Sequence, residues 1–196
     1  MVPAILFAVS VHEFSHGMMA YRLGDPTAKY QGRLTLNPLA HLDPLGALML
    51  VLFRFGWAKP VMVNPLYFKD RRRGMMMVGL AGPLANVISA WVFRILLRIL
   101  PSLFSLRIGL VLHQFILLNI AINLGLAAFN LIPIPPLDGS KIVAGLLPAR
   151  YETRFQRLET YGPVVLLVLL FTGLASRLMS PIVSFLGRLI SIFPRF

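Results

Sequence analysis

The segment HEFSH at residues 12–16 places two imidazoles and a carboxylate inside an otherwise apolar stretch. An α-helix turns about 100° per residue, so His12 and His16 lie about 40° apart on one face and one turn apart along the axis. Two imidazoles at this spacing can hold one zinc ion, and Glu13 on the same side can handle the protons of a hydrolytic water. The pattern therefore predicts a zinc site with a catalytic carboxylate.

A plainer interpretation of HEFSH is a pair of structural histidines that hydrogen-bond to a neighbouring helix. The chain has four histidines in all, and two of them fall in this segment. Ionisable side chains are expensive in an apolar membrane helix and usually serve a function there. We therefore favour the metal site over the structural pair.

A third metal ligand is expected, because catalytic zinc usually has three protein ligands and a water. The chain has no cysteine and seven acidic residues, so the ligand is a carboxylate or another histidine. Asp138 follows NLIPIPP at the end of a long apolar run, where prolines end the helix and can aim the carboxylate back toward the membrane. The alternative is that Asp138 caps a helix starting near Ser140.

Asn119, Asn123 and Asn130 form a single polar stripe on the apolar run before Asp138, at about 0°, 40° and 20° around a helix. Buried amides of this kind either hold helices together or line a cavity that receives a substrate backbone. The pattern alone leaves both roles open.

The composition indicates that lipid surrounds much of the chain. Of 196 residues, 57% are hydrophobic and 13% are charged, with a mean hydropathy of +0.77. A soluble domain needs more polar surface than this, so we predict a single, all-α, polytopic membrane domain over residues 1–196. The net charge of +12 comes largely from basic residues beside apolar spans, as in KDRRRG (69–74), which favours contact with lipid over nucleic acid.

Hydrophobic runs and turn residues predict four to six membrane helices or half-helices. The first helix has no charged n-region or cleavage pattern and is expected to be retained. The short run 45–57 is expected to insert partway, and the tail 161–194 to break around Arg177 and Pro181. The full predicted helices are 1–22, 74–99 and 107–131. A small membrane-associated β segment is expected near 30–37 and 58–65.

Basic loops at 22–33, 69–73 and 141–157 are expected on one side of the membrane, which the positive-inside rule makes the cytoplasmic side. Three arginines on the other side weaken this bias: Arg94, Arg98 and Arg107. His16 lies roughly 9 Å from the helix end near Arg22, at 1.5 Å per residue. The metal is therefore expected inside the bilayer, near the cytoplasmic face.

Five separated segments together resemble the motifs of the site-2 protease family of intramembrane zinc metalloproteases, in the order usual for that family. They are HEFSH (12–16), NPLAHLDPLG (37–46), GWAKPVMVNP (56–65), AGPLAN (81–86) and NLIPIPPLDG (130–139). No inserted PDZ or CBS domain is evident, so the chain resembles a compact form with a core over 1–147 and less distinctive helices over 161–194.

The resemblance implies the roles of particular residues. It implies that His12, His16 and Asp138 bind one zinc ion and that Glu13 is the catalytic acid and base. It also implies that Asn130 and His41 lie near the scissile carbonyl of the substrate.

The expected function is an intramembrane endopeptidase that takes part in regulated intramembrane proteolysis in a bacterial or archaeal cell membrane. Its substrate would be a single-span membrane protein, such as an anti-sigma factor or a membrane-tethered transcription factor. The stretch GRLTLN (32–37) is either a strand edge that captures the unwound substrate or an ordinary connection. The alternative function is a membrane metal-ion transporter or metal-binding protein, which the one-sided placement of the ionisable residues disfavours.

Overall fold

The computed structural model describes residues 1–53, 59–100, 104–148 and 152–192, and within them the fold is helical. The three helices predicted in full are confirmed to within a few residues, as α1, α5 and α6. The elements in chain order are α1 (Val2–Arg22), α2 (Thr27–Tyr30), α3 (Pro38–His41), α4 (Pro44–Phe53), the 3₁₀ turn η1 (Pro65–Tyr67), α5 (Arg71–Ile99), α6 (Leu106–Asn130), α7 (Asp138–Leu146), α8 (Glu152–Phe171) and α9 (Leu174–Ile192).

Helix α1 buries a line of residues that carries the histidines, in addition to Ser10 and Gly17. Every fourth residue from 4 to 20 is buried: Ala4, Ala8, His12, His16 and Ala20. Residues four apart lie on one helix face, so the alanines flank the imidazoles along a single line of contact. Because alanine has only a methyl group, the neighbouring helix α5 can approach closely along this line.

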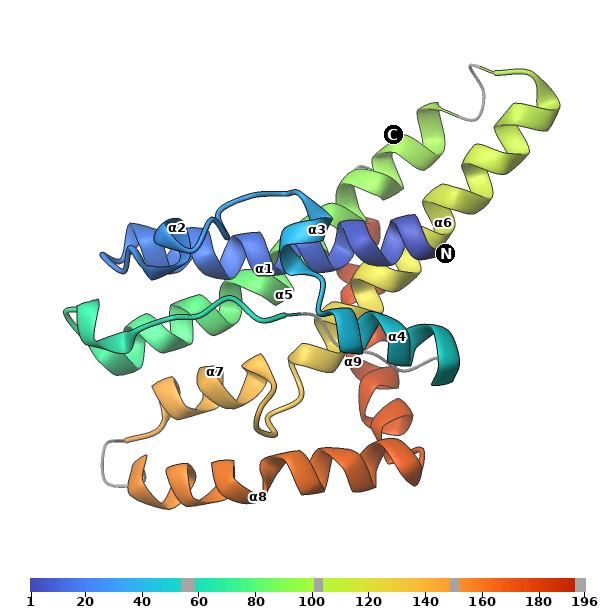
Figure 1. Cartoon of the computed structure of the whole chain (residues 1–196). Coiled ribbons are helices and arrows are strands. Elements are labelled where there is room, and N and C mark those ends of the chain that lie inside the picture. The colour runs from blue at the N-terminus through green and yellow to red at the C-terminus, as the bar shows by residue number, and fades with distance from the viewer. Residues whose placement is uncertain (54–58, 101–103, 149–151, 193–196) are drawn as a thin grey trace.

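Helix α5 is the centre of the fold, because α1, α6 and α7 all pack against it. Its glycines Gly79 and Gly82 make these approaches possible. A methyl group at Gly82 would lie 2.5 Å from His16 Nε2, and one at Gly79 would lie 3.1 Å from the backbone oxygen of Asp138. Figure 1 shows α5 and α6 extending together beyond the other helices.

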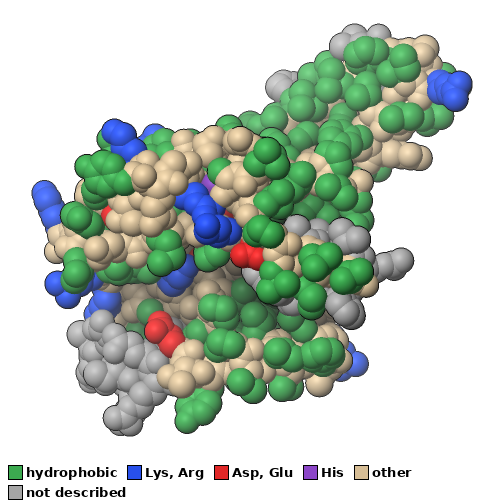
Figure 2. Space-filling model, in the orientation of Figure 1, with side chains coloured by type: hydrophobic (Ala, Val, Ile, Leu, Met, Phe, Trp, Pro, Cys, Tyr) green, Lys and Arg blue, Asp and Glu red, His purple; other side chains and the backbone are tan. Residues whose placement is uncertain are grey.

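Two helices in the described part of the chain are long and apolar enough to cross a membrane, α5 and α6. A third span is possible by length if Glu159–Phe171 and Leu174–Ile192 count as one bent element, with an angle of 87° between them. Figure 2 shows hydrophobic side chains covering the projecting ends of α5 and α6. Such surface is stable in lipid, and the chain is an integral membrane protein. The larger number of four to six segments is not confirmed.

The expected β segment is absent from the described residues, which contain no strand. At 30–37 the chain leaves α2 and turns at Gly32, whose φ is +68°. From 59 onward the backbone N–H groups are used elsewhere: Lys59 donates to the His41 carbonyl and Val61 donates to the Glu13 carboxylate. Backbone pairing is therefore limited to the bond from Lys59, beside an isolated bridge at Leu42, and no ladder extends along 59–64 because Val61 and Asn64 donate to side-chain carboxylates.

The C-terminal helices break at a different place from the one expected. The break falls at residues 172–173, where Gly173 has a φ of +72° that suits glycine. Arg177 and Pro181 instead lie inside α9. The conformational freedom of Gly173 therefore sets the position of the break. Pro181 is tolerated within α9.

Several helix ends gather at one end of the molecule, in agreement with the expected placement of the basic loops. Figure 1 shows the C-terminus of α1, the N-terminus of α5 and the C-terminus of α7 at this end. The C-terminus of α5 and the N-terminus of α6 lie at the other.

The connection after α1 is held by Asp25, which is fully buried. Its Oδ1 accepts from the backbone N–H and the hydroxyl of Thr27, and its Oδ2 accepts from the N–H of Asn64 at 2.7 Å. One carboxylate therefore joins the end of α1 to the segment 59–64. This segment passes over the polar face of α1.

Replacing Asp25 with alanine is expected to lower the free energy of unfolding by about 1–3 kcal/mol for each buried donor that loses its partner. Thermal or denaturant unfolding in detergent measures the effect. Asp70→Ala is the control, because the Asp70 carboxylate caps α5 from an exposed position and its loss costs only about 1 kcal/mol. An equal loss in both variants would contradict the role assigned to Asp25.

Candidate metal centre

Three ligand atoms from two distant parts of the chain converge between α1 and α7. His12 Nε2 and His16 Nε2 are 3.0 Å apart, and Asp138 Oδ2 lies 3.1 Å from the first and 3.0 Å from the second. All three residues are buried. The structure thus brings together the three ligands that the resemblance implies.

The protonation of both imidazoles follows from their outer partners. His16 Nδ1 lies 2.7 Å from the backbone oxygen of Val78, which can only accept, so Nδ1 carries the proton. His12 Nδ1 lies 2.6 Å from the side-chain oxygen of Asn86 and is protonated for the same reason. In each neutral ring the lone pair is therefore on Nε2, at the point where the three ligand atoms meet.

The orientation of Asn86 is itself fixed. Its amide nitrogen donates to the backbone oxygen of Ala8 at 3.0 Å and to the side-chain oxygen of Asn123 at 2.9 Å. Both hydrogens of the amide are used, so its oxygen must face His12. Asn123 of the stripe on α6 therefore supports the metal ligand His12 from outside, through Asn86.

The residues fit a zinc ion. In the neutral rings that bind a metal, Nδ1 carries the proton and both Nε2 lone pairs face the same point, beside Asp138 Oδ2. Tetrahedral zinc with bonds of about 2.0–2.1 Å sets its ligand atoms about 3.3 Å apart. The observed triangle is within a few tenths of an ångström of this spacing. Two imidazoles and a carboxylate are also a ligand set typical of catalytic zinc.

Asp138 reaches the histidines because of the chain that precedes it. The residue begins α7, whose capping position is Leu137 and whose first turn receives no side-chain cap. The Asp138 carboxylate therefore does not cap the helix, in contrast to the alternative interpretation of the sequence. A methyl group at Gly139 would lie 2.4 Å from the backbone oxygens of Leu131 and Ile132, so only glycine lets the chain fold back so tightly here.

A cavity of about 340 Å³ opens beside the three ligands. Glu13 and Asn130 both line it, as do Val61 and Lys141. The Glu13 carboxylate accepts a hydrogen bond from the N–H of Val61 at 2.9 Å, which holds it beside the cavity. Asn130 donates to the Leu126 carbonyl at 3.0 Å, which leaves the second hydrogen of its amide for another acceptor.

His41 is not among the residues that line this cavity. It ends α3, is buried, and donates from Nε2 to the backbone oxygen of Thr35 at 2.8 Å. Its Nδ1 has no hydrogen-bond partner among the described residues. The structure thus gives His41 a place in the connection between α2 and α4, and a catalytic role for it stays a prediction.

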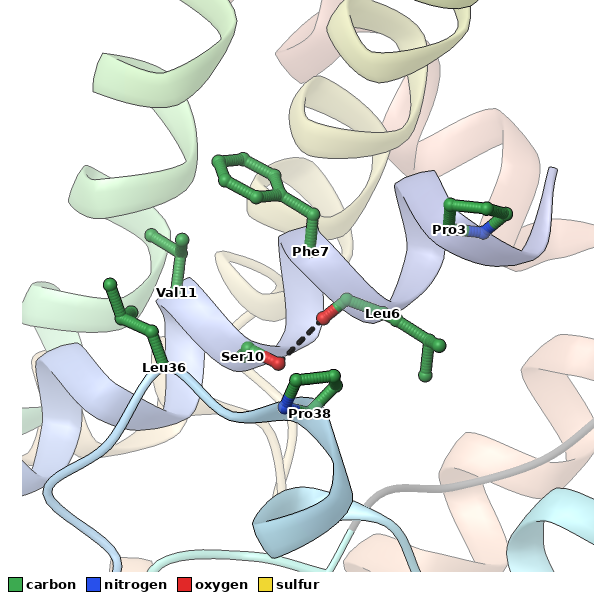
Figure 3. A pocket seen from close by; sticks show the side chains of 7 residues that line it. All are labelled: Pro3, Leu6, Phe7, Ser10, Val11, Leu36 and Pro38. Carbon is green, nitrogen blue, oxygen red and sulfur yellow. Dashed lines mark hydrogen bonds between the residues drawn. The ribbon is translucent and has the colours of Figure 1, made fainter.

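A second cavity, of about 320 Å³, lies along the N-terminal half of α1 (Figure 3). Its lining is apolar except for Ser10, whose hydroxyl donates to the Leu6 carbonyl of the same helix at 2.7 Å. No ionisable side chain lines it. The groups able to do chemistry on α1 therefore belong to the cavity beside the metal ligands.

Three groups that hydrogen-bond or ion-pair with the site residues were not predicted from the sequence. Two are backbone groups, the carbonyl of Val78 and the N–H of Val61, and side-chain patterns carry no signal for such contacts. The third is Lys141, whose Nζ lies 2.9 Å from Asp138 Oδ1. Its position three residues after Asp138, on the same helix face, is a signal that was available.

Comparisons with known proteins point to a family of zinc metalloproteases. The model of peptidase family M50 matches residues 103–172. A Bacillus subtilis protein named "Putative zinc metalloprotease YwhC" is 40% identical over 189 residues, covering 94% of this chain and 85% of the relative. A Methanocaldococcus jannaschii protein, "Putative zinc metalloprotease MJ0611", is 32% identical over 137 residues, covering 67% of this chain and 62% of the relative. No solved structure matches the chain.

The helical fold and the three converging ligands define a membrane protein with a buried metal centre. The similarity to YwhC over most of both chains makes the assignment specific. The chain belongs to peptidase family M50, the site-2 protease family of zinc metalloproteases. Its cofactor is zinc, and the residues that fit the ion are His12, His16 and Asp138.

Replacing Asn86 with leucine removes the acceptor for His12 Nδ1 while nearly keeping the side-chain volume. Loss of such an outer partner is expected to weaken zinc binding by about 10–100-fold. Competition with a chelator measures the dissociation constant.

Asn119→Leu is the matched control for Asn86→Leu. Asn119 is also fully buried, but it supports Asn123 through its backbone oxygen, which the substitution keeps. Equal zinc affinity in the two variants would refute the assigned role of Asn86.

Proposed function

We propose that this protein is an intramembrane zinc endopeptidase that hydrolyses peptide bonds in or near the membrane segments of single-span proteins. The observation that carries the proposal is the convergence of His12, His16 and Asp138, with Glu13 on the wall of the adjoining cavity. Three protein ligands leave a coordination position open, which distinguishes a catalytic centre from a closed structural one.

Bound zinc supplies a Lewis acid that lowers the pKa of water and polarises the substrate carbonyl. Glu13 then acts as general base, taking the proton of the attacking water, and as general acid, passing that proton to the leaving amine. The N–H of Val61 stabilises the ionised form of Glu13 and directs one of its oxygens. The second oxygen is the one assigned to proton transfer.

Asn130 is proposed to stabilise the negative charge that develops on the scissile carbonyl oxygen. The position of Asn130 on the cavity wall, with one amide hydrogen beyond the bond to Leu126, supports this role. Donors aimed at a developing oxyanion contribute strongly in a site with little water.

We infer a multi-pass arrangement with the active site toward the cytoplasmic side of a bacterial or archaeal cell membrane. Helix α1 joins α5 and α6 as a membrane segment in this arrangement, although His12, Glu13, His16 and Arg22 lower its hydropathy. The basic residues near the N-terminus of α5 support the orientation, because positively charged flanks favour the cytoplasm.

The proposed substrates are membrane-tethered regulators, such as anti-sigma or transcription factors, cleaved in regulated intramembrane proteolysis. A helical substrate must unwind before its carbonyls become accessible, since each one is hydrogen-bonded within the helix. Residues 60–63 line the cavity without helical structure, and this segment is the part of the chain best placed to receive an unwound peptide.

Glu13→Gln is expected to retain zinc and lose cleavage by at least about 100-fold, because a neutral amide cannot accept the proton. Glutamine keeps an oxygen for the N–H of Val61, so the local structure is preserved. The assay follows a panel of tagged single-span proteins in proteoliposomes. Glu159→Gln, an exposed position on α8, is the matched control. Wild-type cleavage by Glu13→Gln would refute the mechanism.

Asn130→Asp keeps the size of the side chain but replaces its donors with a negative charge. The rate of cleavage is expected to fall about 10²–10³-fold, as for loss of one oxyanion donor. Zinc affinity should not fall, because Asn130 makes no hydrogen bond to the three ligand residues and the added negative charge attracts the cation. Asn37→Asp, at the exposed cap of α3, is the control. A large loss of zinc from Asn130→Asp would show that Asn130 supports the metal site instead.

A further inference from the structure

The two oxygens of Asp138 have different partners. Oδ2 faces the two histidines, at 3.1 and 3.0 Å, whereas Oδ1 lies 2.9 Å from the ammonium group of Lys141. Asp138 is buried, while about a third of the Lys141 side chain is exposed and lines the cavity. A carboxylate free of other partners can bind a metal ion through both oxygens. In Asp138, Oδ1 already accepts a hydrogen bond from Lys141.

The stem of Lys141 is held against α5. A methyl group at Gly79 would lie 3.0 Å from Lys141 Cβ and 3.5 Å from its Cδ, so the stem runs over the glycine with no room to spare. The side chain therefore turns back along α7 toward Asp138, three residues earlier. Gly79 and Lys141 together set the direction of the ammonium group.

We propose that Lys141 is a positioning residue that commits Asp138 to coordination through a single oxygen. The charge-assisted hydrogen bond fixes the carboxylate plane and directs Oδ2 toward the metal position. It also keeps Oδ1 from taking the coordination position that the hydrolytic water needs. Lys141 acts only through Asp138 and takes no part in proton transfer.

Two effects of Lys141 on zinc binding have opposite signs, which makes the proposal testable. The ammonium group repels a divalent cation, so removing it would strengthen zinc binding if charge alone mattered. Removing it also frees the Asp138 carboxylate to rotate, which weakens binding if orientation matters. Loss of an outer partner of this kind typically costs about 10–100-fold in affinity. The proposal requires that orientation outweigh repulsion.

The test titrates zinc into metal-free protein in the presence of a competing chelator. Lys141→Met, which keeps the length of the stem, is expected to bind zinc about 10–100-fold more weakly. Lys141→Arg, which restores a charged donor, should bind as the wild type does. Lys59→Met is the matched control, because Lys59 is exposed and lines a neighbouring pocket away from the ligands.

Unchanged or tighter zinc binding by Lys141→Met would overturn the proposal, and so would failure of Lys141→Arg to restore affinity. The melting temperature of the metal-free variants separates this effect from unfolding. If Lys141→Met does not fold, Lys141→Gln is the second uncharged variant, with the same expected loss. The inference rests on the proposed hydrolytic centre but is measured on metal binding. Absence of proteolysis would therefore refute the proposed function and leave this result standing.

Discussion

The structure depends on two hydrogen bonds between α1 and α5, from His12 Nδ1 to the Asn86 side chain and from His16 Nδ1 to the Val78 carbonyl. Each bond settles which nitrogen of its ring carries the proton, and so places a lone pair at the metal position. Without them each imidazole is free to rotate or to change tautomer. The ligand set is therefore a property of the helix pair, and HEFSH on an isolated helix would not define it.

Such bonds require the two helix axes to lie close together, and small residues on both helices meet that requirement. Alanines flank the histidines along the buried stripe of α1, and Gly82 on α5 leaves the space that the imidazoles fill. In a lipid environment, helices associate through close packing and interhelical hydrogen bonds more than through burial of apolar surface. The small residues of α1 and α5 thus allow the two helices to pack closely and also leave space for the imidazoles.

The periodicity of apolar and polar side chains predicted the long helices that position the site. The apolar runs predicted the bounds of α1, α5 and α6, and the prolines before Asp138 indicated a carboxylate aimed back toward the membrane. The β segment expected near 58–65 is not confirmed, since residues 59–65 form no strand and the alternation of residue types does not show where backbone N–H groups go. Those of Lys59, Val61 and Asn64 go to groups on other elements. For the same reason the partners of Glu13 and His16 on the backbone could not be predicted.

Two carboxylates in an apolar surrounding need partners, since an unpaired buried charge is strongly destabilising. Asp138 has the histidines and Lys141, and Glu13 has the N–H of Val61, whose segment is tied to the end of α1 through Asp25. These partners come from α1, α7 and the segment 59–64, while α5 orients the imidazoles. Asp138 meets the histidines only when α1 and α7 are both in place, and Glu13 meets its N–H donor only when segment 59–64 lies against α1. Metal binding and assembly of the fold are thus coupled, because the ligand atoms converge only in the assembled protein.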